Sequence, residues 1–508
     1  MLGITLDTAL PNPLHAQIGE QLRAAILERR LAAGAKLPSS RLLASDLDCA
    51  RGTVLSALDR LLAEGYLTSR AGAGLFVASD LPEEMLAPPS VVRDLQGSVA
   101  KDKPMLPFRT RALLDGRAAK MNPTDAAPIA FPMGQPDRSV FPFPLWAKLL
   151  EREWRQPAWQ IAGTPHPFGH SGLRESIASY LGAARGFICD PRAIVVTSGV
   201  RESVSLFART VLEAGDDVWI EEPGYPGIVK ALVSAEVHVV PIPIDECGLP
   251  PDRALELAPD ARLAVVAPSH QFPLGTVMTL QRRLTLLGWA ERTKSWVIED
   301  DLDGEYRYSG RPLAPLRALD RTGRVAYLGN FSKLLFPSLR LSYLVLPDSL
   351  VEATEAMMTG VPAQASLLGQ GALARFIAEG HLAAHLRRTR RLYAGRQEAM
   401  IYSAHRRLEG LLSIAPDPAG MHLIARPHRD FDSAFDDQAA TAAAAAMRVK
   451  VSPLSACYRN SPKGRGLMLG YAGTPEVEID PAISRLRDAL GTLHDRSGQS
   501  LHKPRRRD

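Results

Sequence analysis

Residues 325–340 read VAYLGNFSKLLFPSLR. The apolar run Val325–Leu328 is typical of a buried strand, and Lys333 follows it closely. A lone lysine after a strand is usually a solvated surface residue, so this stretch by itself leaves the role of Lys333 open. The neighbouring motifs therefore have to decide whether it belongs to a site.

An acidic motif lies upstream of this stretch. A strand predicted at Trp296–Glu299 runs directly into Asp300 and Asp301, and the carboxyl ends of parallel strands form the edge of a sheet that faces ligands. The acidic motif could be a solvated loop. Alternatively, Asp300 pairs with the protonated pyridine nitrogen of pyridoxal phosphate while Lys333 forms the imine with its aldehyde.

Three further features favour this second interpretation. Ser198 and Gly199 close a strand and open a helix, where free backbone N–H groups and the helix dipole can hold a phosphate. Arg340 can add a bidentate contact to that phosphate. Tyr225 follows another strand and offers an aromatic ring to stack on the pyridine. Each feature is ordinary alone, but their joint order at successive strand ends points to a cofactor site.

The alternation of strand-like and helical stretches runs from Phe131 to about Leu493. It predicts a largely parallel sheet with helices on both faces. The alanine-rich run Ala439–Ala446 is predicted to be a helix. The other predicted strands are Ile194–Thr197, Asp217–Ile220, Val237–Pro241, Leu263–Ala267, Leu341–Leu346 and Val449–Val451.

The N-terminal residues predict a winged helix-turn-helix. The second helix of such a pair enters the major groove with its first residues facing base edges, and a glycine-rich wing approaches the backbone. The alternative is a winged helix that contacts only protein. Helices are predicted at Leu14–Leu31, Ser40–Leu47 and Arg51–Glu64, with strands at Tyr66–Thr68 and Leu75–Val77. The predicted DNA-contacting residues are Arg41, Arg51, Gly52, Thr53, Arg70 and Gly72.

Composition sets the limits of these predictions. The 508 residues are 46% hydrophobic and 23% charged, which excludes a single small module and global disorder. The net charge is +5, but Lys503–Asp508 hold four positive charges and one negative, so a net +3 lies in this tail. Met1–Ser79 hold 8 Arg and Lys against 7 Asp and Glu, so DNA affinity has to come from charge placement and dimerisation.

The four cysteines are far apart, which argues against disulfides and thiolate zinc sites and fits a reducing cytoplasm. We expect no export segment and no membrane span. His381 and His385 lack the glutamate of a zinc motif, and no metal site is predicted. The expected domains are residues 1–79 (winged helix), 80–127 (a proline-containing linker), 128–493 (the α/β domain) and 494–508 (a basic disordered tail).

The motifs also resemble known families. Leu37–Arg41, Arg51–Val54, Glu64–Leu67 and Gly72–Val77 match the DNA-binding domain of GntR-type repressors. The large domain resembles fold-type I aminotransferases, which bind pyridoxal phosphate, through Pro268–Pro273, the acidic strand end, the FSK motif and Leu469–Ala472. Together they resemble the MocR subfamily of GntR regulators. The sequence departs from the family pattern at Asp48–Ala50, which replaces Gly-Val-Ser, and at Thr164, Val200, Leu302 and Asn330.

The resemblance implies site residues and partners. Lys333 would be the Schiff-base lysine, with Asp300 at the ring nitrogen and Tyr225 stacked on the ring. Either Gln271 or His270 would lie near the phenolic oxygen. A homodimer that binds double-stranded DNA is also implied. The phosphate would be held by Ser198, Gly199 and Arg340, with Arg201 compensating for Val200. Ser332 would also belong to the cofactor site.

Three functional hypotheses follow. The first is a transcriptional regulator whose large domain binds pyridoxal phosphate or an amino compound as effector. The second is a working aminotransferase with an appended DNA-binding module, for which Arg426, Arg459 and Arg465 are candidate partners of a substrate carboxylate. The third is a DNA-binding regulator that has lost the cofactor.

Overall fold

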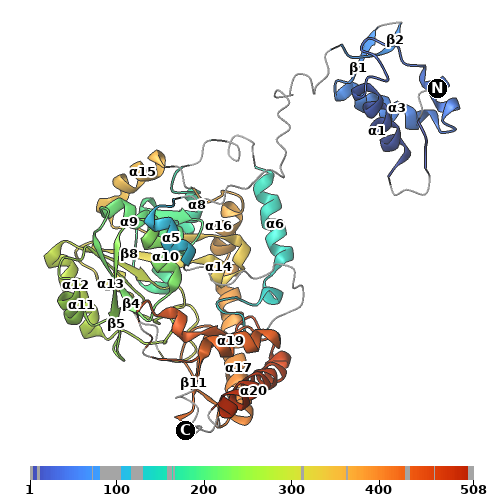
Figure 1. Cartoon of the computed structure of the whole chain (residues 1–508). Coiled ribbons are helices and arrows are strands. Elements are labelled where there is room, and N and C mark those ends of the chain that lie inside the picture. The colour runs from blue at the N-terminus through green and yellow to red at the C-terminus, as the bar shows by residue number, and fades with distance from the viewer. Residues whose placement is uncertain are drawn as a thin grey trace. The chain divides into compact units, whose positions relative to one another are not determined.

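The computed structural model describes residues 4–7, 12–70, 73–79, 105–115, 130–156, 163, 166–310, 314–361, 364–429, 435–460, 462 and 464–500. The chain divides into two compact units, residues 1–105 and 106–508 (Figure 1). Within the described residues, no helix is both long and apolar enough to cross a membrane. The two units are described in turn below.

The N-terminal unit is the predicted winged helix-turn-helix. Its core is formed by Ile18 and Leu22 of the first helix and by Val54, Leu58 and Leu61 of the third, all of them buried. The two strands pair antiparallel as the wing. The elements are α1 (Leu14–Leu27), α2 (Ser40–Asp46), α3 (Arg51–Ala63), β1 (Leu67–Arg70) and β2 (Gly74–Val77).

The two helices of the helix-turn-helix begin differently. Ser39 caps α2, because its hydroxyl accepts a hydrogen bond from the Leu42 N–H at 3.3 Å. Ala50 occupies the same position before α3 and has no side chain that can cap it. Replacing Ala50 with serine is therefore expected to stabilise α3 by about 1 kcal/mol.

Hydrogen exchange of the α3 amides, followed by mass spectrometry in the full chain, checks this prediction. The Ala50→Ser variant should slow their exchange about fivefold, whereas the matched variant Ser39→Ala should speed exchange in α2. Unchanged exchange in α3 of the serine variant would contradict the prediction.

The large unit is built on a seven-stranded sheet in the order β3-β9-β8-β7-β6-β4-β5. Neighbouring strands from β8 to β5 run parallel, and only β9 runs antiparallel to both of its neighbours. This confirms the largely parallel sheet expected from the sequence. The strands are β3 (Ile194–Thr197), β4 (Asp217–Glu222), β5 (His238–Pro243), β6 (Leu263–Val266), β7 (Trp296–Asp300), β8 (Val325–Asn330) and β9 (Ser342–Val345).

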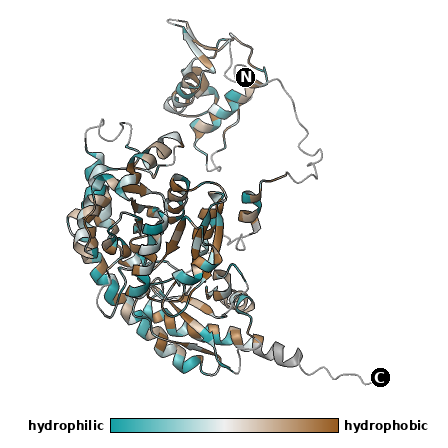
Figure 2. Ribbon diagram, turned by 90° about the vertical axis from the view of Figure 1, so that its left-hand side faces the viewer, coloured by the Kyte–Doolittle hydropathy of each residue, from teal (hydrophilic) through white to brown (hydrophobic). Residues whose placement is uncertain are grey.

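Helices cover both faces of this sheet. Along β4, Val218 and Ile220 join one buried cluster while Trp219 joins another, because successive side chains of a strand point to opposite faces. The brown strands at the centre of the large unit in Figure 2 show the same apolar layer. The helices are α9 (Val200–Val211), α10 (Pro226–Ser234), α11 (Pro251–Leu257), α12 (Leu280–Thr293), α13 (Leu316–Leu319), α14 (Phe331–Leu334) and α15 (Val351–Gly360).

A second, four-stranded antiparallel sheet lies in the C-terminal part of this unit, in the order β10-β11-β13-β12. The prediction of a strand at Val449–Val451 is wrong. Val449 forms only an isolated bridge with Ala130, and the strand begins after it, at Ser452. The elements are α6 (Phe143–Trp154), α8 (Ser171–Arg185), α16 (Gln370–Ala378), α17 (His381–Arg407), β10 (Leu412–Ile414), β11 (His422–Pro427), α19 (Asp437–Ala446), β12 (Ser452–Pro453), β13 (Leu467–Gly470) and α20 (Glu476–Ser500).

Two segments predicted to be irregular contain helix. Helix α5 (Phe108–Asp115) interrupts the linker expected over residues 80–127 and packs against α10. Its Arg109 forms an ion pair with Glu236, which follows α10. Helix α20 continues to Ser500, into the tail expected from residue 494. The helix in the linker is only eight residues long and follows Pro104 and Pro107. Its apolar residues therefore do not show a clear helical spacing in the sequence. The remaining linker, residues 80–104 and 116–127, and residues 501–508 lie outside the described residues.

Candidate cofactor site and DNA-contacting surface

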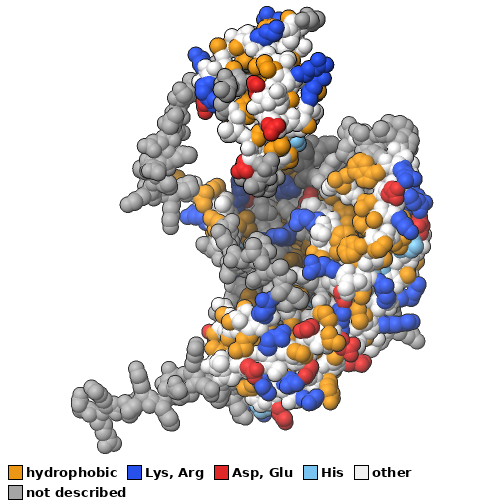
Figure 3. Space-filling model, turned by 90° about the vertical axis from the view of Figure 1, so that its right-hand side faces the viewer, with side chains coloured by type: hydrophobic (Ala, Val, Ile, Leu, Met, Phe, Trp, Pro, Cys, Tyr) orange, Lys and Arg blue, Asp and Glu red, His pale blue; other side chains and the backbone are white. Residues whose placement is uncertain are grey.

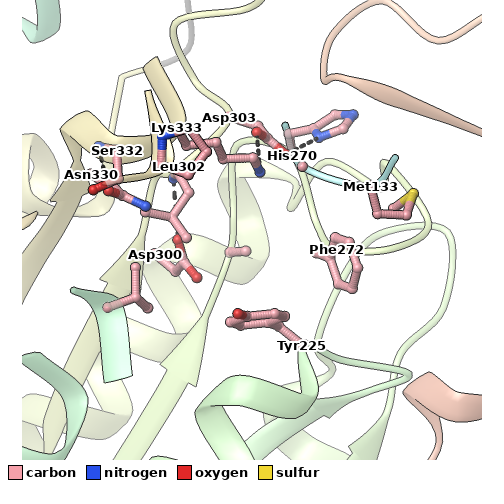
Figure 4. A pocket seen from close by; sticks show the side chains of 14 residues that line it. Met133, Tyr225, His270, Phe272, Asp300, Leu302, Asp303, Asn330, Ser332 and Lys333 are labelled. Atoms are coloured by element: carbon pink, nitrogen blue, oxygen red, sulfur yellow. Dashed lines mark hydrogen bonds and ion pairs between the residues drawn. The ribbon is translucent and has the colours of Figure 1, made fainter. Parts of the chain in front are cut away.

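The carboxyl ends of β7 and β8 open into a cavity of about 300 Å³, within the usual size range of small-molecule sites (Figure 4). Three of the predicted residues, Lys333, Asp300 and Tyr225, line this one cavity although they are far apart in the sequence. The lining residues are Met133, Gly134, Val200, Tyr225, Ala267, His270, Phe272, Asp300, Leu302, Asp303, Asn330, Ser332, Lys333 and Pro337.

Lys333 is held by the short helix α14, which starts where β8 ends. The Asn330 side chain caps this helix by accepting a hydrogen bond from the Ser332 N–H at 2.8 Å. The Ser332 hydroxyl in turn accepts from the Leu341 N–H at 3.0 Å. Asn330, where the family pattern has a hydroxyl residue, therefore helps to fix the backbone that carries the lysine.

Asp300 lies at the end of β7, on the cavity wall. One of its carboxylate oxygens accepts a hydrogen bond from the Leu302 N–H at 3.1 Å. Burial raises the pKa of Asp300 to about 7, although the Lys333 ammonium group partly opposes this shift. A carboxyl group poised in this way can pair with a protonated ring nitrogen, which would favour its ionised form.

Asp303 was not predicted from the sequence, yet its carboxylate forms an ion pair with Lys333. Burial by itself would raise the pKa of Asp303. The Lys333 ammonium and the His270 imidazole outweigh this effect and hold that pKa well below its usual range. The sequence feature that could have pointed to it is the third aspartate of the run Asp300, Asp301 and Asp303 at the end of β7.

Tyr225 forms the opposite wall of the cavity, as Figure 4 shows. The residue is 40% exposed, and its ring packs edge-to-face with Phe272 at a centroid distance of 5.7 Å. A Cβ atom at Gly227 would lie 2.4 Å from the Tyr225 ring, so the glycine makes room for this ring position. The exposed ring is therefore free to stack on a planar ligand.

His270 and Gln271 have different roles in the structure. His270 lines the cavity, whereas the Gln271 side chain is buried in the loop. The Gln271 amide donates to the carbonyls of Pro223 and Phe272 and accepts from the Leu274 N–H. Of the two residues expected near the phenolic oxygen, the geometry thus favours His270.

The residues expected at the phosphate are only partly brought together. Val200, the first residue of α9, lines the cavity with Asn330 and Ser332, so the start of a twelve-residue helix points an N–H-rich end at this wall. The Ser198 N–H donates instead to the Glu202 carboxylate. Four of the predicted residues, together with the three candidate carboxylate partners, are not among the described lining residues of this cavity: Ser198, Gly199, Arg201, Arg340, Arg426, Arg459 and Arg465.

The residues present fit pyridoxal phosphate at three points. They supply an amine at Lys333 for the aldehyde, an acid at Asp300 for the ring nitrogen, and an aromatic wall at Tyr225. The start of α9 offers backbone donors for the phosphate. Leu302, where the family pattern has a tyrosine, lines the cavity without offering a hydroxyl.

The turn after α14 also depends on a buried histidine. The His385 side chain of α17 donates from Nε2 to the Leu334 carbonyl at 3.2 Å, and the Tyr306 hydroxyl donates to the same carbonyl at 3.3 Å. Burial lowers the pKa of His385 to about 4. This histidine therefore stays neutral in the folded protein at pH values where it is protonated in the unfolded chain.

The difference between the pKa of His385 in the folded and unfolded states predicts a loss of stability in acid. The contribution of neutral His385 to the free energy of unfolding is fully present above the unfolded pKa of about 6.5 and is lost as the pH falls toward 4. Between pH 7.5 and 5, the free energy of unfolding should fall about 2 kcal/mol less in the His385→Gln variant than in the unmodified protein. Urea titrations at the two pH values measure this, and equal pH dependence of both proteins would refute the prediction.

The predicted DNA-contacting residues gather at the start of α2 and α3. Arg41, Arg51 and Gly52 are exposed, and Thr53 is half-buried. The Arg51 Nε donates to the Ser40 hydroxyl at 3.2 Å, which ties the two helix starts together. On the wing, the Arg70 guanidinium lies 4.6 Å from the Phe76 ring centroid. Gly72 lies outside the described residues.

Basic side chains form patches on the surface of the N-terminal unit (Figure 3). Arg51 and Gly52 are exposed at the start of α3, the end of the second helix that faces base edges in helix-turn-helix proteins.

Comparisons with known proteins agree with both units. The family described as bacterial regulatory proteins, gntR family, matches residues 14–77. The family described as aminotransferase class I and II matches residues 134–486. The probable rhizopine catabolism regulatory protein MocR of Rhizobium meliloti is 39% identical over 98% of both chains.

Two further relatives extend these comparisons. The pyridoxine biosynthesis transcriptional regulator PdxR of Corynebacterium glutamicum is 31% identical over 96% of this chain and 98% of its own. Among solved structures, the Pyrococcus horikoshii kynurenine aminotransferase has a TM-score of 0.65 at 26% identity. It covers 77% of this chain and 95% of its own. The chain thus joins a DNA-binding unit to an aminotransferase fold.

Proposed function

Because this chain belongs to the MocR group of GntR-type transcriptional regulators, we propose that its large unit binds pyridoxal phosphate and that this binding controls its affinity for DNA. The observation that carries the proposal is the convergence of Lys333, Asp300 and Tyr225 on one cavity. An amino compound that reacts with the bound cofactor is the proposed effector.

The residues of the candidate cofactor site have proposed roles. Lys333 bonds covalently to the cofactor aldehyde, Asp300 pairs with the ring nitrogen, and Tyr225 stacks on the ring. His270, which lines the same cavity, would lie near the phenolic oxygen. When bound, pyridoxal phosphate supplies an electrophilic carbon and an electron-withdrawing ring. The phosphate is held by the backbone at Val200 and by Ser332. Ser198, Gly199, Arg201 and Arg340 are the further candidates for phosphate contacts.

The proposed DNA half of the function rests on the exposed starts of α2 and α3. Arg51 and Thr53 contact base edges, Arg41 contacts a phosphate or a guanine, and Arg70 contacts the backbone from the wing. A homodimer would place one winged helix on each of two half-sites. A ligand that favours one arrangement of the units changes DNA affinity by the ratio of its affinities for the two arrangements.

Two measurements on the full chain test this proposal. Titration with pyridoxal phosphate should produce an absorbance band distinct from that of the free cofactor. Fluorescence anisotropy on the DNA upstream of the protein's own gene should then show a different affinity with and without cofactor. Absence of the band would favour a regulator that has lost the cofactor. Repeated exchange between an amino donor and a keto acid would instead favour a working aminotransferase.

A further inference from the structure

Four alternating charges connect Lys333 to the C-terminal part of the large unit. Lys333 forms an ion pair with Asp303, whose other carboxylate oxygen lies 3.8 Å from Nδ1 of His270. The His270 Nε2 lies 3.1 Å from the Asp417 carboxylate. Asp303 and His270 are almost completely buried. The four residues follow β8, β7 and β6 and precede β11, so each comes from a different part of the chain.

Two glycines leave room for the His270 and Asp417 side chains to approach each other. A Cβ atom at Gly420 would lie 2.5 Å from the His270 ring, and one at Gly275 would lie 2.2 Å from an Asp417 carboxylate oxygen. The Ala419 N–H also donates to Asp417 at 2.9 Å. The imidazole therefore has a fixed place between two carboxylates. These two carboxylates outweigh burial and raise the pKa of His270 to about 9.

Asp303 is the group in direct contact with the Lys333 amine. The other titratable groups that face Lys333 are Asp300 across the cavity, His270 behind Asp303, the buried His422 of β11, and Tyr225 on the opposite wall. Asp303 remains ionised at neutral pH, because Lys333 and His270 both stabilise its charged form.

We propose that Asp303 is the positioning residue of Lys333, which holds the lysine as an ammonium group and so makes covalent capture of an aldehyde depend on release of one proton. The inference rests on the proposed function. An ammonium nitrogen has no lone pair, so Lys333 first gives one proton to solvent. Its nitrogen then attacks the aldehyde carbon, a carbon–nitrogen double bond forms, and the carbonyl oxygen leaves as water.

The rate of pyridoxal phosphate capture by the full chain, measured by stopped-flow absorbance between pH 6 and 10, tests this. Loss of the carboxylate in Asp303→Asn should move the midpoint of the pH–rate profile about one to three pH units lower. The Asp303→Glu variant should restore it toward the unmodified value. Borohydride reduction followed by intact mass measurement should report the covalently bound fraction independently of any turnover.

A second variant should shift the midpoint of the pH–rate profile in the opposite direction. His270→Gln removes a cation that shares Asp303 with Lys333, so its midpoint should move to higher pH. The matched control is Glu305→Gln, which changes a buried acid of the same turn that contacts Tyr180 and Arg185 and does not line the cavity. It should keep the unmodified midpoint.

The outcomes separate the inference from the proposed function. If the unmodified protein captures no pyridoxal phosphate, the proposed function fails and the inference falls with it. If capture occurs but Asp303→Asn keeps the unmodified midpoint, or Glu305→Gln shifts it equally, only the inference is overturned. If Asp303→Asn does not fold, an unshifted or lowered midpoint in His270→Gln overturns it.

Discussion

Replacing Lys333 with alanine is expected to abolish the absorbance band that pyridoxal phosphate gives with the protein. Lys333 is the only amine among the described residues that line the cavity, so no neighbouring lysine can take over the covalent bond. Titration of both proteins with cofactor, followed by borohydride reduction and mass measurement, checks this. The reduced adduct should be absent from the variant.

Two controls isolate the covalent role of the lysine. Lys333→Arg keeps a cation beside Asp303 but lacks a nucleophilic amine, so it should also lose the band while preserving the folded structure. Lys148→Ala changes an exposed lysine of α6 and should retain the full band. An equal band in Lys333→Ala would mean that the cofactor binds elsewhere and would remove the assignment of this site.

Replacing Arg51 with alanine is expected to weaken DNA binding at least tenfold. The reason is that one bidentate contact between arginine and a base is worth about 1 to 3 kcal/mol, and a dimer would lose two such contacts. The change also removes the hydrogen bond to Ser40 that joins the starts of α2 and α3. Anisotropy titrations at several salt concentrations measure the loss.

The matched control for Arg51 lies on the same helix. Arg60 is an exposed arginine near the end of α3, where it forms an ion pair with Glu64. Its replacement with alanine should change DNA affinity by less than about twofold, because Arg60 lies at the opposite end of α3 from the residues that face the bases. Its exposed ion pair contributes only about 0 to 1 kcal/mol to stability, so the fold should be kept. Equal losses in the two variants would contradict a specific role for the start of α3.

The convergence of Lys333, Asp300 and Tyr225 could be predicted because it depends on topology. Asp300 ends a strand of the sheet, and Lys333 and Tyr225 come three residues after the ends of two others. The carboxyl ends of parallel strands share an edge. All seven strands of this sheet were predicted, because buried strands form compact apolar runs. Helix α5 was missed because eight residues next to prolines carry too little periodic signal.

The details inside the turns could not be predicted in the same way. The direction of a side chain after a strand depends on the loop backbone, as His270 and Gln271 illustrate. These residues are adjacent, yet one lines the cavity and the other bonds to its own loop. Asp303 was missed for the same reason, because the sequence does not show that its side chain turns toward Lys333. The Ser198 N–H was expected to face a phosphate, but it donates to the carboxylate of Glu202 in the first turn of α9.

The position of β3 has a consequence for synthesis of the protein on the ribosome. This edge strand has a single neighbour in the sheet, and its Ile194 pairs with Val345 of β9, which is translated much later. At about 5 to 20 residues per second, β3 waits on the order of ten seconds for its partner. The nascent chain thus exposes an unpaired apolar strand during this interval, and such strands are prone to aggregate.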